Sequence, residues 1–173
     1  AGILEVTGSL AVGNEVGVVS GALAGTGTVN AVVTLSGTGG VNLQDAAVGT
    51  LTLASDLAID GAVGANDLTF DLGNAAGGTD KITVGGNVTM TTSGAAVINL
   101  NQLGGTKIDV GTYDLIVASG TMETVDKFAL ATSSAFGNNF ALQVTGSTLQ
   151  VVVTSAASAP AVASLARPTG PLP

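Results

Sequence analysis

Hydrophobic residues alternate with polar or small residues in short bursts along the chain. Between residues 50 and 60, Leu51, Leu53, Leu57 and Ile59 share one parity, and threonine or aspartate stands at most positions of the other parity. The same alternation recurs at residues 68–72, 82–84, 88–90, 98–100, 113–117, 140–144 and 149–153. A period of two indicates strands that bury one face. The pattern therefore predicts an all-β chain of many short strands.

Glycine-containing breaks such as SGTGG, GNAAGG and VGG separate the bursts. Glycine supplies positive backbone φ at little steric cost, so we interpret these breaks as corners between strands. Strands of about four residues at about ten-residue spacing are typical of a sandwich, a barrel or a solenoid. The spacing alone leaves these three architectures open.

Two further features favour a solenoid. All four prolines lie at or after Pro160, so every earlier residue keeps a backbone N–H for strand pairing. Aromatic residues make up 3% of the chain, whereas the core of a sandwich is usually filled by larger side chains. We predict a β-solenoid domain over residues 1–154 and a Pro/Ala-rich extended tail or linker over residues 155–173. A β-sandwich or jelly-roll resembling a pilin is the alternative.

Residues 121–139 interrupt the alternation. Met122, Val125, Phe128 and Ala129 fall near helical spacing, which predicts one or two helical turns. An extended loop over the end of the tube is the alternative.

The order of four segments resembles the autotransporter-associated β-strand repeat proteins, a family of exported bacterial surface proteins. The segments are DLGNAAGGTDKITVGGNVTM, INLNQLGG, GTYDLIVASG and FALQVTGSTLQVVVT, within residues 45–154. The resemblance implies a right-handed parallel β-helix, export to the cell surface, and a structural or adhesive role. Residues 1–44 share only composition with that family.

Charge excludes several classes of partner. The chain has 12 acidic and 4 basic residues and a net charge of -8, which repels nucleic acid and anionic membrane surfaces. Polar residues interrupt every apolar stretch, so no membrane span is predicted. The chain lacks cysteine, and its start at Ala-Gly without a signal peptide leads us to expect a processed, exported protein.

Candidate chemistry is sparse. Asp80 and Lys81 are adjacent in a predicted strand and should point to opposite faces, so we interpret Asp80 as the start of a strand that accepts loop N–H groups. Asp56, Asp60, Asp67 and Asp71 are the candidate oxygen ligands for Ca²⁺, but no D-x-D-x-D-G loop is present, and we expect them to lie on solvated faces and in turns. The only enzyme class left open is carbohydrate cleavage by paired carboxylates. We predict a protein that is not an enzyme and has no cofactor or metal.

The two ends of a solenoid expose unpaired strand edges unless something caps them. Both the start, ILEVTGSLAV, and the end, LQVVVT, look ready to pair. We therefore predict an extracellular filament or matrix subunit that stacks head to tail as a homopolymer. The predicted subunit contacts are the apolar residues of the two ends and the tail: Ile3, Leu4, Val6, Leu10, Leu149, Val151, Val153, Pro160 and Leu165.

Two alternatives remain for the function. One is a stalk or passenger module of an adhesin that binds glycans or surface proteins. The other is an all-β pilin in which one terminus complements a neighbouring subunit as a donated strand.

Overall fold

The computed structural model describes residues 2–11, 13, 15–61, 67–73, 78–91, 94–104 and 108–156. Within these ranges the chain is almost entirely β-strand, which confirms the all-β class, and its single helix is the 3-10 turn η1 (Val125–Lys127). The strands are β1 (Gly2–Glu5), β2 (Ser9–Leu10), β3 (Glu15–Ala24), β4 (Thr28–Val29), β5 (Val32–Asn42), β6 (Thr50–Leu53), β7 (Leu57–Gly61), β8 (Asp67–Leu72), β9 (Lys81–Val84), β10 (Val88–Met90), β11 (Ala96–Gln102), β12 (Gly111–Ala118), β13 (Phe128–Leu130), β14 (Ser134–Ala135), β15 (Asn138–Thr145) and β16 (Thr148–Ser155).

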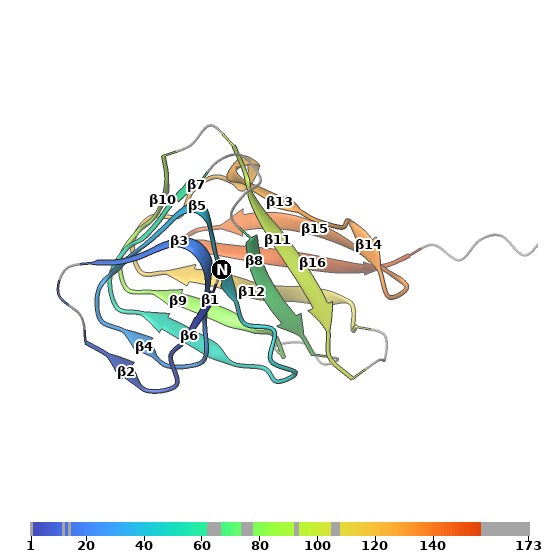
Figure 1. The fold of residues 1–173 in the computed structure, drawn as a ribbon. Coiled ribbons are helices and arrows are strands. Elements are labelled where there is room, and N and C mark those ends of the chain that lie inside the picture. The colour runs from blue at the N-terminus through green and yellow to red at the C-terminus, as the bar shows by residue number, and fades with distance from the viewer. Residues whose placement is uncertain are drawn as a thin grey trace, which may run out of the picture.

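The strands form two sheets of eight (Figure 1). The first sheet follows the order β1-β3-β5-β8-β11-β13, and β7 and β10 branch from the first half of β5. All pairs in this sheet are parallel. The second sheet follows β14-β15-β16-β12-β9-β6-β4-β2, parallel from β2 to β12 and antiparallel from β12 to β14. The chain passes back and forth between the sheets, as parallel pairing requires, because parallel neighbours need a crossover connection.

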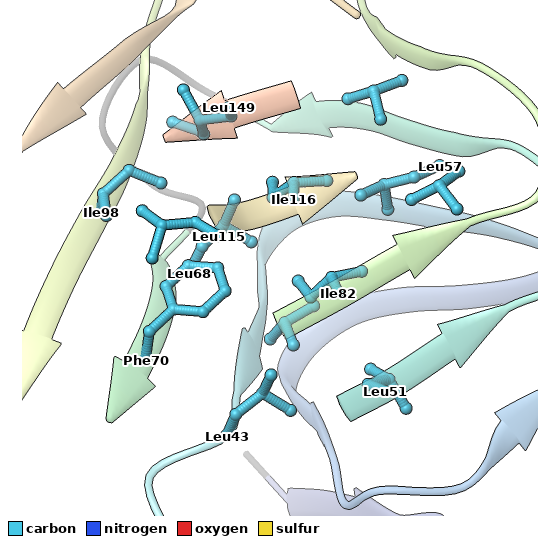
Figure 2. Packing of buried hydrophobic residues seen from close by; sticks show 14 of the residues in the cluster. Leu43, Leu51, Leu57, Leu68, Phe70, Ile82, Ile98, Leu115, Ile116 and Leu149 are labelled. Atoms are coloured by element: carbon cyan, nitrogen blue, oxygen red, sulfur yellow. The ribbon is translucent and has the colours of Figure 1, made fainter. Parts of the chain in front are cut away.

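Both sheets contribute to one hydrophobic core (Figure 2). The alternation seen in the sequence places one face of each strand inside: Leu51 and Leu53 have 0% exposure, and Thr50 and Thr52 do not point into the core. Parallel register then stacks like on like, so that Leu23, Val41, Leu68 and Ile98 occupy equivalent positions on β3, β5, β8 and β11. Each fully buried aliphatic side chain of this kind stabilises the fold by about 1.5–3 kcal/mol.

The prediction that the SGTGG segment forms a corner is wrong, because this segment lies inside the long strand β5. Gly37 has φ +57, and the ladder with β3 shifts register between Val18 and Ser20. A Cβ on Gly39 would stand 1.8 Å from the Val18 carbonyl oxygen. Glycine is needed here because β5 bends so that its first half pairs with β7 and its second half with β8.

Two other local expectations change. The alternation at Tyr113, Leu115 and Val117 fails after Leu115, because a register shift between Asp114 and Ile116 buries Leu115 and Ile116 together and turns Val117 outward. Residues 121–139 contain one helical turn, η1, followed by the short strands β13 and β14. The segment is therefore neither two helical turns nor an extended loop.

Candidate functional site

The first candidate site is the N-terminal edge, where both sheets end. β1 is the last strand of the first sheet and β2 the last strand of the second. Among the described residues, no strand pairs with their outer sides, nor with the outer side of β3 from Glu15 to Val19. Such edges present free backbone N–H and C=O groups that can pair with another strand.

The hydrophobic core is open at this edge. Ile3 is 67% exposed and Leu4 is 46% exposed, whereas Leu23, which stands opposite Leu4 on the neighbouring strand β3, is fully buried. Leu10 is likewise only partly buried, while its neighbour Val29 is fully buried. The core rows of β1 and β2 therefore end without a layer that covers them.

The same holds for the first half of β3. Val16 and Val18 are partly buried, whereas Val33 and Leu35, their partners on β5, have 0% exposure. A hollow of about 300 Å³ lies beside them, between β1 and β3, and Val19 on its rim is 64% exposed. We call the unpaired outer side of Glu15–Val19 with this hollow the β3 slot.

The C-terminal end is built differently, and the prediction of a free LQVVVT edge is wrong. β16 pairs with β12 on one side and with β15 on the other. The predicted contacts Leu149, Val151 and Val153 have 0% exposure, so their side chains belong to the core. The cause is a two-residue turn at Gly146, with φ +58, and Ser147, which folds β15 back onto β16.

Strand edges nevertheless remain at this end. No strand among the described residues pairs with the outer side of β13, and β14 covers β15 only at Asn138 and Asn139, which leaves the outer side of Ala141–Thr145 open. β13 is parallel to β1 through the whole first sheet. β15 is antiparallel to β16, which is antiparallel to β12, so β15 runs in the direction of β2.

The remaining predicted contacts divide as follows. Ile3, Leu4 and Leu10 lie at the open N-terminal edge. Val6 lies there too, but its side chain is only 6% exposed. Pro160 and Leu165 lie outside the described residues. The sequence did not single out Val16, Val18 and Val19, because alternation shows that a strand has a buried face but not that a neighbour is missing.

A second candidate site is a pair of buried carboxylates, Asp71 and Asp80, which are 0% and 1% exposed. Asp80 accepts the N–H groups of Gly49 at 2.8 Å and of Asp71 at 2.7 Å. Its role as an acceptor of loop N–H groups at the start of β9 is thus confirmed. Asp71 was expected to be solvated, and this is wrong.

Asp71 holds a corner of the fold together. One carboxylate oxygen accepts the N–H groups of Asp45 and Ala46, and the other accepts the Asn101 amide at 2.5 Å. The carboxylate, which belongs to β8, therefore connects the loop after β5 with β11. The strands β5, β8 and β11 are neighbours in this order in the first sheet. Ala46 has φ +65, a left-handed conformation that these hydrogen bonds help to hold.

Burial raises the pKa of Asp80 from 3.8 to about 6. The hydrogen bonds from Asp71 and Gly49 act in the opposite direction, and the charges of Asp71 and Asp45 raise the pKa further. Among the described residues, the groups that donate to either carboxylate are backbone or amide N–H groups. We interpret the pair as a structural clamp.

Two of the other aspartates, Asp56 and Asp60, also accept hydrogen bonds within the fold. Asp56 accepts the Asn87 N–H at 2.7 Å, and the Asn87 side chain accepts the N–H and hydroxyl of Thr121 in turn. Asp60 accepts the Thr91 hydroxyl, and Asp67 is exposed. Within the described residues, no three His, Cys, Asp or Glu side chains are grouped so that they could hold a metal ion.

Comparison with known proteins adds no identification. The chain matches no protein-family model and no curated protein. In the described part of the chain, every helix is too short or too polar to cross a membrane.

Proposed function

We propose that this protein is a non-enzymatic structural subunit of an extracellular filament or matrix, formed by head-to-tail stacking of right-handed parallel β-helix units. The observation that carries the proposal is the open N-terminal edge, where the core row of the first sheet ends at Leu4, which is 46% exposed, and that of the second sheet ends at the partly buried Leu10. Another copy that covered these side chains would gain about 1.5–3 kcal/mol for each one fully buried.

Three features support a β-helix over a jelly-roll. The chain crosses repeatedly between the two sheets, and the pairing is parallel from β1 to β13 and from β2 to β12, whereas jelly-rolls are built from antiparallel strands. Side chains at the corners bond to equivalent positions one turn further along the chain. Asp56 and Asn87 are 31 residues apart, and Asn87 and Thr121 are 34 apart.

The strand directions support head-to-tail stacking. Because β13 and β15 run in the same direction as β1 and β2, the C-terminal end of one copy can continue both sheets of the next copy with parallel pairing. The two contacting surfaces differ, and a contact of this kind produces an open fibre when its rotation does not close a ring. The resemblance of residues 45–154 to exported surface proteins supports the extracellular location.

The test is assembly of the full chain as its concentration rises, followed by light scattering and negative-stain microscopy. We expect the protein to form fibres, and we expect Leu4→Lys to abolish them because the lysine would place a charge in the covered core row. Val48→Lys is the matched control, since Val48 is 45% exposed and lies on the loop before β6, outside the edge strands.

Monodisperse monomers of the unchanged protein at millimolar concentration would overturn the filament. That result would favour the adhesin stalk, in which coils of the same polypeptide cover the edge. Equal assembly of the Leu4→Lys and Val48→Lys variants would overturn the N-terminal edge as the contact.

A further inference from the structure

At the β3 slot, the position that β1 occupies beside the second half of β3 holds no described strand. β1 covers only Gly21–Ala24, the second half of β3, so that no strand in the described part of the chain pairs with the outer side of Glu15–Val19. Val16 and Val18 consequently remain partly exposed at the end of core rows that are fully buried on β5 and β7. One added strand would pair with the backbone and cover both valines.

Head-to-tail stacking alone does not fill this slot. At the C-terminal end, the strands β7 and β10 are followed in the sheet by the segment that begins at Thr121. The Thr121 carbonyl accepts the N–H of Val88 on β10 at 2.9 Å. If β1 of one copy pairs with β13 of the next, one strand position, about 4.8 Å wide, remains between that segment and Glu15–Val19.

We propose that residues 161–167 of a second copy of this chain insert into the β3 slot as this added strand. The inference rests on the proposed head-to-tail assembly. The segment AVASLAR contains no proline but is bounded by Pro160 and Pro168, so it has a full set of backbone donors over seven residues. Strand addition to an open edge is a common mode of recognition, in which main-chain hydrogen bonds supply the affinity.

Charge also favours this occupant. The first 24 residues carry two acids, Glu5 and Glu15, and no lysine or arginine. Residues 157–173 carry the only arginine of the chain, Arg167, and no acid. Opposite charges on the two segments promote their encounter and disfavour pairing of two N-terminal edges with each other.

The chain's own tail is too short to reach its own slot. Ala156 donates its N–H to the Gly137 carbonyl at the C-terminal end of the molecule. The strand β2 lies at the same end of the molecule as the β3 slot. From β16 to β2 the second sheet has five strand intervals, so that the two ends are about 24 Å apart. Residues 157–160 bridge at most about 18 Å when fully extended. In a head-to-tail stack, by contrast, the slot of the next copy lies beside this end.

The experiment uses disulfide capture, because the chain has no cysteine of its own. Two full-length variants with different tags are mixed and oxidised, one carrying Val19→Cys and the other Leu165→Cys or Ala166→Cys, so that either face of the added strand is sampled. Val48→Cys replaces Val19→Cys as the control. We expect a mixed disulfide at least tenfold more abundant with Val19→Cys than with Val48→Cys, since only adjacent strands bring cysteines within bonding geometry.

Equal capture at positions 19 and 48 would overturn the inference. So would a disulfide that forms only within a single chain when Val19→Cys and Leu165→Cys are combined and diluted. These outcomes are independent of the filament test, because fibres that form and are abolished by Leu4→Lys would leave the proposed function standing even if the tail is not captured.

Discussion

At the residue scale, polar side chains in this protein hold neighbouring strands and loops together. The Asp71 carboxylate joins three segments by accepting hydrogen bonds, and the Asn87 side chain both donates to Asp56 and accepts from Thr121. A hydrogen bond from a backbone N–H to a charged acceptor is worth about 1.5–3 kcal/mol, and a buried donor that loses its acceptor costs as much. The corners therefore depend on a few acids, although the sequence alone could not separate these acids from solvated ones.

Asp80 makes the stability depend on pH. Its folded pKa of about 6 exceeds the ordinary value of 3.8, so the folded protein binds a proton that the unfolded chain does not between about pH 4 and 6. We expect the free energy of unfolding to fall as pH rises through this window, by on the order of 2 kcal/mol from this group. Urea unfolding at a series of pH values measures it.

The variant Asp80→Asn should lose this part of the pH dependence, because its amide does not titrate. Asp67→Asn, on an exposed side chain of β8, should keep it. A pH profile of the Asp80→Asn variant that superimposes on that of the unchanged protein would assign the dependence to other groups.

At the element scale, the turns decide which strand edges stay open. Alternation located most strands correctly, but it did not show that β15 and β16 form a hairpin that closes the end of the second sheet. The signal was present, because Gly146 and Ser147 separate two alternating runs by two residues, a typical hairpin connection. The bend of β5 was hidden for the opposite reason, since its glycines look like a corner although the strand continues through them.

The hairpin between β14 and β15 contains a turn that the sequence does not favour. Phe136 has φ +53 and Gly137 has φ +72, so the two-residue loop needs left-handed backbone at both positions. Phe136 is 44% exposed, and a left-handed conformation costs a residue with a Cβ about 1–2 kcal/mol. We expect Phe136→Asn to raise the free energy of unfolding by about 1 kcal/mol, because asparagine before glycine suits this turn.

Phe136→Ala is the matched control, since it removes the exposed ring but keeps the unfavourable backbone. Chemical denaturation should rank the asparagine variant above both the alanine variant and the unchanged protein. Equal stability of the asparagine and alanine variants would show that loss of the ring, and not backbone strain, governs the change.

At the scale of the whole molecule, the core is closed at one end and open at the other. The C-terminal end contains η1, β13 and the strands β14–β16, whereas no strand among the residues that the structure describes covers the outer sides of β1, β2 and the first half of β3. The sequence predicted strands in the segment ILEVTGSLAV, and β1 and β2 confirm them, whereas the absence of a cap at this end stays a prediction. The sequence could not show the asymmetry, because the hairpin and the β3 slot depend on which strands pair at long range.

This asymmetry predicts uneven protection of backbone amides from hydrogen exchange. In dilute solution, amides of β1 and β2 should exchange fastest among the strands. Within the described residues, each of these two strands pairs on one side only and lies at the open end of the core, whereas β9 and β12 pair on both sides. As the concentration rises into the range of assembly, protection should increase at Gly2–Glu5 and Ser9–Leu10, and at Phe128–Leu130 on the opposite end. The Leu4→Lys variant should show no such increase. Protection that is uniform along the strands, or that never changes with concentration at β1, would mean that nothing covers the open edge.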